Sequence, residues 1–337
     1  MNRLKRIAIL SIFALLAGFV PAGGIAQAQT VSIEEWEVPW DNSRPRDPFV
    51  DPKGRVWFCG QKGGYIAYLE PASGTFKKFD LGPGAGPHNL IVDAAGFVWF
   101  AGNRNAYIGK LDPDTGGITQ FEMPHKEARD PHTLVFDRAG DIWFTVQRSN
   151  FIGKLFTQSG EVRLIKVPTR NALPYGIWMD SHNRPWVALF GSNKIVSVDP
   201  ETMELKEYEL PRKDARPRRL AITSDGVVWY GDYAQGMLGR FDPKNGEFRE
   251  WPLPGGDDSG PYAMTVDHED RVWVVETGNM PNRLVGFNTS TKQFVHITEI
   301  PEGGGSVRHM MFDANEKTIW FGEDTNFIGR ARIGKQE

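Results

Sequence analysis

The stretch "PHNLIVDAAGFVWFAG" (residues 87–102) is followed 44 residues later by a close copy, "PHTLVFDRAGDIWFTV" (residues 131–146). Each copy holds a proline, an apolar segment that ends in Asp, a turn with glycine, and a second apolar segment around a tryptophan. Self-similarity at a fixed period is typical of repeat architectures. The number of copies therefore decides the fold.

The same segment recurs along the chain, and its tryptophans are 42, 44, 43, 43, 44 and 47 residues apart: Trp57, Trp99, Trp143, Trp186, Trp229, Trp273 and Trp320. Each period contains four short strand-like segments separated by turns such as "DPDTGG" and "DPKNG". Four strands in a period of this length are typical of one propeller blade. We predict an all-β, seven-bladed propeller of four-stranded blades, forming a single domain over residues 29–337.

The last period ends one strand short, at "FIGRARI" (residues 327–333). The segment "IEEWEVP" (residues 33–39) resembles "EFREWPLP" (residues 247–254), which ends another period. We therefore expect the N-terminal strand to complete the last blade. Such a closure removes the open sheet edges on which chains aggregate.

The first residues are typical of a secretory signal peptide: three cations precede the apolar residues 7–20, and "AQA" ends at Ala28. We predict cleavage of residues 1–28 near Ala28 and a periplasmic or secreted protein. The apolar run is shorter than the roughly 20 residues of a spanning helix, so we expect no membrane span. We also expect a monomer.

The chain has 39 Lys and Arg against 42 Asp and Glu, a net charge of −3, which disfavours a nucleic-acid partner. Its single cysteine, Cys59, lies between aromatic residues and glycine in "VWFCG". An intrachain disulfide is impossible with one cysteine, and we predict a buried thiol.

Two positions of each blade are expected at one mouth of the channel, because the first strand begins where the antiparallel second strand ends. The residue after each first-strand proline gives one ring: Arg46, His88, His132, Tyr175, Arg218, Tyr262 and Arg308. The residue three after each tryptophan gives another: Gly60, Gly102, Val146, Leu189, Asp232, Glu276 and Glu323. His309 is one residue out of phase and is expected to point away from the channel.

These rings allow three interpretations. Asp130 and His132 lie on one loop in "DPH", and with His88 they form a candidate metal or acid–base set. Alternatively, the three ring arginines only pair with the three ring carboxylates. In the third interpretation the ring binds a carboxylate-bearing or peptide-like ligand. Its candidate substrate contacts are Arg46, Tyr175, Arg218, Tyr262, Arg308, Glu276 and Glu323.

The blade pattern, with "PH" at His88 and "DPH" at residues 130–132, resembles the streptogramin B lyases, also called virginiamycin B lyases. The resemblance implies a seven-bladed propeller that opens a cyclic ester by magnesium-assisted elimination. It implies His132 as the general base, with His88 and Asp130 holding a divalent metal or polarising the carbonyl. This chain departs from the family pattern where Asp130 replaces a glutamate and Val146 replaces a metal-binding glutamate.

The resemblance implies magnesium, but the nitrogen-rich set of His88, His132 and Asp130 is better suited to zinc or another transition metal such as manganese. The leading expectation is an exported carbon–oxygen lyase of this type, acting on a cyclic ester or related small molecule. The alternative is a non-catalytic propeller that binds a peptide, a cell-wall fragment or a partner protein. A lactone hydrolase is less favoured, because those propellers typically have six blades.

Overall fold

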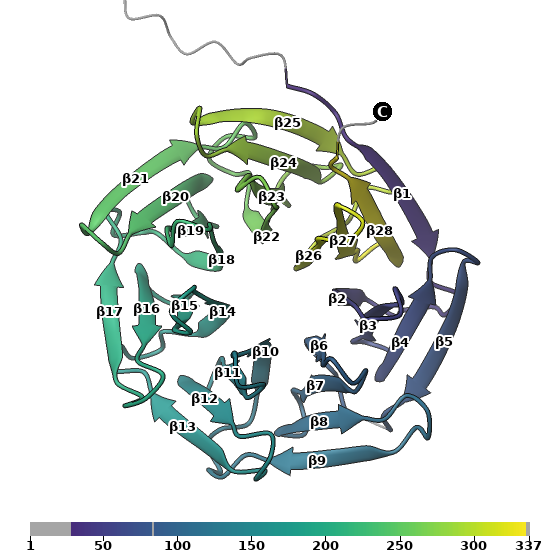
Figure 1. The fold of residues 1–337 in the computed structure, drawn as a ribbon. Helices are drawn as coiled ribbons and strands as arrows, with labels where there is room; N and C mark the ends of the chain where they lie inside the picture. The colour runs from purple at the N-terminus through teal and green to yellow at the C-terminus, as the bar shows by residue number, and fades with distance from the viewer. Residues whose placement is uncertain (1–27, 83, 335–337) are drawn as a thin grey trace, which may run out of the picture.

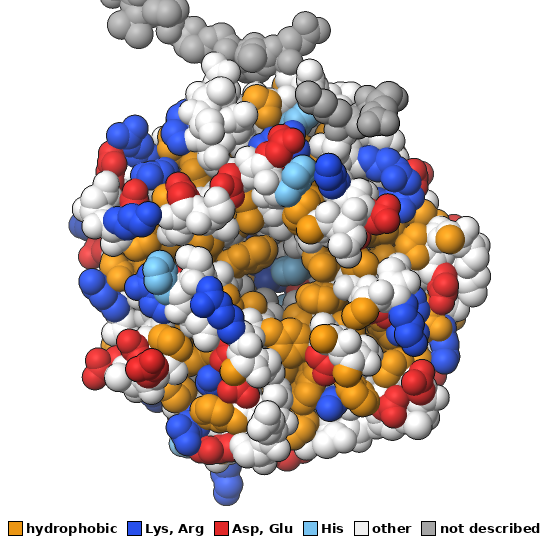
Figure 2. Space-filling model, in the orientation of Figure 1, with side chains coloured by type: hydrophobic (Ala, Val, Ile, Leu, Met, Phe, Trp, Pro, Cys, Tyr) orange, Lys and Arg blue, Asp and Glu red, His pale blue; other side chains and the backbone are white. Residues whose placement is uncertain are grey.

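Seven four-stranded antiparallel sheets stand like blades around a common centre (Figure 1). The hollow at this centre (Figure 2) is the mouth of the channel. The structure, a computed structural model, describes residues 28–82 and 84–334. The all-β, seven-bladed prediction is confirmed. No helix in these two ranges is long and apolar enough to cross a membrane.

Every blade runs from an innermost strand at the channel to an outermost strand at the rim. The innermost strands are β2 (Pro45–Val50), β6 (Leu90–Val92), β10 (Pro131–Phe136), β14 (Pro174–Met179), β18 (Pro217–Ile222), β22 (Pro261–Val266) and β26 (Met310–Asp313). The second strands are β3 (Val56–Gly60), β7 (Val98–Gly102), β11 (Ile142–Val146), β15 (Pro185–Leu189), β19 (Val228–Asp232), β23 (Val272–Glu276) and β27 (Thr318–Gly322).

The third strands are β4 (Tyr65–Glu70), β8 (Tyr107–Leu111), β12 (Phe151–Leu155), β16 (Lys194–Val198), β20 (Met237–Asp242), β24 (Arg283–Asn288) and β28 (Phe327–Arg332). The outermost strands are β5 (Thr75–Asp80), β9 (Ile118–Glu122), β13 (Val162–Lys166), β17 (Leu205–Glu209), β21 (Glu247–Pro252), β25 (Gln293–Glu299) and β1 (Ser32–Glu37). We number the blades one to seven in the order of their innermost strands.

The ring closes as the sequence predicted. Strand β1 pairs antiparallel with β28, and Trp36 lies opposite Ile328 (Figure 1). The ring of Trp36 also packs 5.5 Å from that of Trp320. The first and last strands of the propeller are thus held together by antiparallel backbone pairing, and an aromatic contact supports this closure. Residues 1–27 of the predicted signal peptide lie outside the described residues.

The repeated aspartate and tryptophan are explained by one recurring hydrogen bond. In blade one the indole Nε1–H of Trp57 donates to Asp51 Oδ2 at 2.8 Å, and the equivalent bond recurs in blades two, three, four and six. The other oxygen of Asp51 accepts the backbone N–H groups of Lys53 and Arg55. The aspartate therefore forms the turn and fixes the tryptophan, which packs between blades.

The hydrophobic core is divided between the blades, because each sheet buries its faces against its neighbours. One cluster joins Trp99 and Ile108 of blade two to Leu134, Phe144 and other residues of blade three. Cys59 is fully buried, as predicted, and burial raises the pKa of its thiol well above the usual value.

Candidate functional site

Irregular pairing at the start of the innermost strands brings extra side chains to the channel. In β10 the pairing with β11 jumps from Pro131 to Leu134, and comparable shifts occur in β2, β14, β18 and β22. A bulge of this kind re-aims side chains that would alternate in a regular strand. Two consecutive residues of one blade can therefore face the channel.

The channel side chains form two layers. The first layer is the ring predicted after each first-strand proline: Arg46, His88, His132, Tyr175, Arg218, Tyr262 and Arg308. The second layer holds the polar side chains one residue further along: Asp47, Asn89, Thr133, Arg219 and His309. Contacts across the channel run within and between these layers, so residues about 90 positions apart meet at the axis.

Histidines and tyrosines fill one side of the first layer. The ring centroids of His88 and His132 lie 3.6 Å apart, and those of His132 and Tyr175 lie 4.1 Å apart. The hydroxyls of Tyr175 and Tyr262 share a hydrogen bond across the channel, between blades four and six. All four side chains are buried.

Arg218 lies in a cage of aromatic rings. Its guanidinium carbon is 3.6 Å from the ring centroid of Tyr262, 4.4 Å from that of Tyr233 and 4.6 Å from that of Phe190. The attraction between a cation and an aromatic face stabilises this arrangement. Its Nε atom is buried and has no hydrogen-bond partner in residues 28–82 and 84–334.

Asp47 is the centre of the second layer. Its carboxylate accepts hydrogen bonds from Arg46 Nε at 2.9 Å, Asn89 Nδ2 at 2.9 Å and Arg219 Nη2 at 3.3 Å. Arg219 also donates to Thr133 Oγ1 at 3.2 Å. This network ties blades one, two, three and five together. Burial alone would raise the pKa of Asp47, but Arg46 and the other cations around it lower it.

The same cations control the ionisation of the first layer. Burial, followed by the charge of Arg46, holds the pKa of His88 well below 6.5. Burial, followed by Arg219, has the same effect on His132. Burial opposes ionisation of Tyr262 as well, yet Arg218 and the other arginines lower the pKa of its hydroxyl below the ordinary value. The channel thus holds neutral imidazoles in a strongly positive environment.

The three carboxylates of the second predicted ring form contacts within their own blades and loops. Asp232 accepts the backbone N–H groups of Arg216 and Ala234. Glu276 pairs with Arg283 and accepts the N–H of Gly255. The third, Glu323, accepts a hydrogen bond from Thr325 Oγ1 at 3.1 Å.

The alternative interpretation, in which the ring arginines only pair with these carboxylates, is wrong. Arg46 pairs with Asp47, its neighbour in the chain, and Arg308 pairs with Asp324, at 3.1 Å from Nε to Oδ1. Asp47 directly follows the ring residue Arg46, and Asp324 directly follows the ring residue Glu323. The local bulges explain the first difference, because they aim consecutive side chains at the same centre.

Asp130 is directed into the neighbouring loop. Its carboxylate accepts hydrogen bonds from the N–H of Arg148 at 2.7 Å and the hydroxyl of Ser149 at 2.9 Å. No group of three or more His, Cys, Asp or Glu side chains with metal-site geometry occurs in the described part of the chain. The channel histidines are instead surrounded by arginines. These residues do not fit the divalent ion that the family resemblance implies, since a hard cation needs oxygen ligands.

The sequence pattern did not indicate Arg219 as a channel residue, and it predicted the wrong direction for His309. Arg219 directly follows Arg218 in "RPRRL" and lies buried at the channel axis. His309 was expected to point away from the channel, but it lines a cavity there. A second polar residue directly after the first-ring residue in five of the seven blades was the available signal, but its use requires knowing that both residues face the channel.

Solved structures with the same architecture cover nearly the whole chain. A streptogramin B lyase is 27% identical, with a TM-score of 0.81, over 90% of this chain and 98% of that one. The virginiamycin B lyase of Staphylococcus aureus is 24% identical, with a TM-score of 0.81, over 90% and 99%. A catalytically inactive variant of that enzyme, with quinupristin, is also 24% identical, with a TM-score of 0.79 over the same shares.

No curated protein matches the chain significantly. A model of the virginiamycin B lyase family, however, matches residues 31–331, which include all seven blades. The chain therefore belongs to the virginiamycin B lyase family.

Proposed function

We propose that this protein is an exported propeller that binds a small carboxylate-bearing molecule, such as a peptide-like ligand, at the arginine-lined end of its channel. The observation that carries the proposal is an excess of positive charge on buried and half-buried side chains. Four arginines reach the channel: Arg46, Arg218, Arg219 and Arg308. Their carboxylate partners are Asp47 and Asp324.

The excess charge has donors that are free to bind. The Nη2 atom of Arg46 and the Nε atom of Arg218 are buried without a partner in residues 28–82 and 84–334. A buried donor without an acceptor is costly, and a charged donor more so. A bound carboxylate would satisfy such donors and compensate the charge. The aromatic rings around Arg218 would contact the apolar part of the ligand.

The test compares two probes that differ only in charge, N-acetylphenylalanine and its amide, by calorimetric titration. We expect the acid to bind at least about tenfold more tightly, because hydrogen bonds to charged groups contribute about 1.5–3 kcal/mol. Binding should persist in chelator, since the arginines and not a metal recognise the probe. Arg218→Met should abolish the difference, whereas the matched control Arg163→Met, an exposed arginine, should keep it. Equal binding of acid and amide to the unmodified protein would contradict the proposal.

A second candidate function is ring opening of a cyclic ester by elimination, and one observation favours it. His132 Nδ1 contacts Thr133 Oγ1 at 2.8 Å, while its buried Nε2 atom has no partner among the described residues. A neutral imidazole with a free nitrogen can act as a general base. Nε2 would take a proton from the carbon next to the ester-bearing carbon. The C–O bond would then break, a C=C bond would form, and the carboxylate would leave toward the arginines.

Mass spectrometry with quinupristin as the probe tests this chemistry. Elimination gives a ring-opened isomer of unchanged mass, whereas hydrolysis adds one water. We expect the isomer from the unmodified protein and none from His132→Ala, while His182→Ala, at an exposed turn, should stay active. Absence of product with the unmodified protein would remove this candidate and leave the binding proposal standing.

A further inference from the structure

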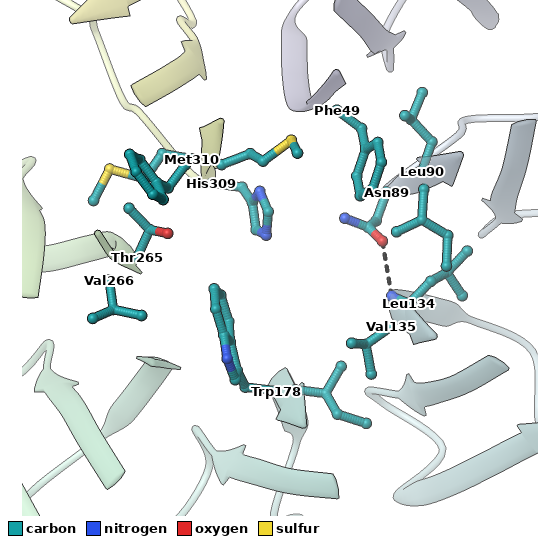
Figure 3. Close-up of a pocket in the computed structure, with 14 residues that line it drawn as sticks. Phe49, Asn89, Leu90, Leu134, Val135, Trp178, Thr265, Val266, His309 and Met310 are labelled. Carbon is teal, nitrogen blue, oxygen red and sulfur yellow. Dashed lines mark hydrogen bonds between the residues drawn. The ribbon is translucent and has the colours of Figure 1, made fainter. Parts of the chain in front are cut away.

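The channel holds a cavity beyond the polar layers. It lies at the other end of the innermost strands and has a volume of about 310 Å³ (Figure 3). Its apolar lining includes Phe49, Leu134, Ile177, Trp178, Met311 and Phe312. Figure 2 shows hydrophobic side chains gathered around the central opening on one face of the propeller. A volume of about 300 Å³ or more is typical of small-molecule sites.

The cavity is separated from the arginine end by the second layer. In blade one the order along β2 is Arg46 in the first layer, Asp47 in the second, and Phe49 at the cavity. Asp47 is held there by Arg219 of blade five, as described above. A ligand in this cavity would therefore meet a different set of side chains from a ligand of the arginine cluster.

Two buried polar atoms at the cavity have no partner in residues 28–82 and 84–334: Nδ1 of His309 and Oγ1 of Thr265 (Figure 3). Thr265 is fully buried, with an exposed fraction of 0%. Unpaired buried polar groups are rare in native proteins, and each calls for a partner. The other polar side chain of the lining, Asn89, is already paired through both its oxygen and its nitrogen.

The polar end of the cavity carries no free charge. Burial, followed by the charge of Arg219, lowers the pKa of His309 to about 3, so its imidazole is neutral at physiological pH. Each nitrogen of the Arg219 guanidinium already donates a hydrogen bond, to Arg308 O, Thr133 Oγ1 and Asp47 Oδ2. The residues that line the cavity include no Lys, Arg, Asp or Glu. An anionic ligand would therefore find no cation in the lining, whereas a hydroxyl could donate to the imidazole and accept from the threonine.

We propose that this cavity binds a small, uncharged, mainly apolar molecule that carries one hydroxyl, such as a phenol or an alcohol. The hydroxyl bonds to His309 and Thr265, and the apolar body packs against Phe49, Trp178 and Phe312. This site is additional to the arginine cluster and is occupied independently of it.

The test uses two shape-matched probes, 4-ethylphenol and 4-ethyltoluene, titrated into the purified protein near pH 7. We expect both to bind and the phenol to bind about tenfold more tightly, because one satisfied pair of buried polar groups separates them. N-acetylphenylalanine should not displace either probe.

Two variants and one control test whether the probes bind in this cavity. His309→Phe should bring the affinity of the phenol down to that of 4-ethyltoluene, and Val266→Trp, which fills the cavity, should abolish binding of both. The control His182→Phe, at an exposed turn, should leave both affinities unchanged. Equal affinity of the two probes for the unmodified protein, or no binding of either, would overturn the proposal without any variant having to fold. Unaltered binding to a folded Val266→Trp protein would also overturn it.

Discussion

His88 of blade two and His132 of blade three pack against each other in the channel, with their ring centroids 3.6 Å apart and their planes tilted by 39°. Both come from the residue after a first-strand proline, which the repeat places at equivalent positions of neighbouring blades. Burial, followed by the charges of arginines from other blades, lowers the pKa of both imidazoles and disfavours their protonation. The pair therefore consists of two uncharged imidazoles, so acid should destabilise the folded protein.

The stability of the protein should fall as the pH drops below about 6.5. The unfolded chain then binds protons on His88 and His132 that the folded protein refuses, so acid favours unfolding. Each histidine should lower the free energy of unfolding by up to about 1.4 kcal/mol for each unit by which the pH lies below the ordinary pKa of its imidazole. The free energy of unfolding, measured with denaturant near pH 7.5 and near pH 5, should fall less between these pH values in His132→Gln than in the unmodified protein. His182→Gln, at an exposed turn, should behave like the unmodified protein. Equal stability at both pH values would contradict the prediction.

Asp47→Asn should destabilise the protein by about 3–5 kcal/mol, the usual cost of removing one partner from a buried ion pair. The substitution leaves Arg46 and Arg219 without their shared carboxylate. Asn keeps the shape and tolerates the left-handed backbone of this residue, whose φ is 52°, so the loss isolates the charge. Chemical denaturation measures the effect, with Glu161→Gln as an exposed control of nearly unchanged stability. A loss of less than about 1 kcal/mol would show that the charge is not needed there.

Glu323→Gln should stabilise the protein at alkaline pH. Burial, followed by the neighbouring Glu35, raises the pKa of Glu323 to about 9. The folded state keeps this proton while the unfolded state releases it near 4.5, so stability is lost progressively as the pH rises from there toward about 9. The variant should unfold at a higher temperature than the unmodified protein near pH 8 and at a similar temperature near pH 4. Glu299→Gln, an exposed control, should show no such pH dependence, and a variant less stable at pH 8 would contradict the sign.

Deletion of β1 should unfold or oligomerise the protein. A chain that starts at Asp41 lacks the ladder between β1 and β28 and exposes the edge of blade seven. Light scattering after size-exclusion chromatography, together with thermal unfolding, compares it with a chain that starts at residue 29. A monomer with an unchanged melting temperature would contradict the role of the closure.

The number, order and strand content of the blades follow from the sequence, because each blade obeys local rules that repeat. In blades one, two, three, four and six an Asp lies six residues before the Trp, as in Asp51 and Trp57, and the two side chains form one hydrogen bond. The closing strand was also predictable, since the last copy lacks one strand and the N-terminal segment resembles what is missing.

The candidate site was predictable only in its first layer. The sequence placed His88, His132 and Arg218 at the channel through their position after a proline, but it missed Arg219 and misplaced His309. For Arg219 the cause is the register shift at the start of β18, because a bulge aims consecutive residues at one centre. His309 directly precedes β26, outside the regular strand in which side chains alternate.

The sequence by itself determined the propeller, because periodic burial and turn formation act within one blade and between neighbours. Only the tertiary structure decided the chemistry of the channel, because that chemistry depends on contacts between distant blades. Asp47 meets Arg219 although 172 residues separate them, while Arg218 lies in its aromatic cage with no carboxylate partner in residues 28–82 and 84–334. Such pairings arise from ring closure, which no local pattern encodes.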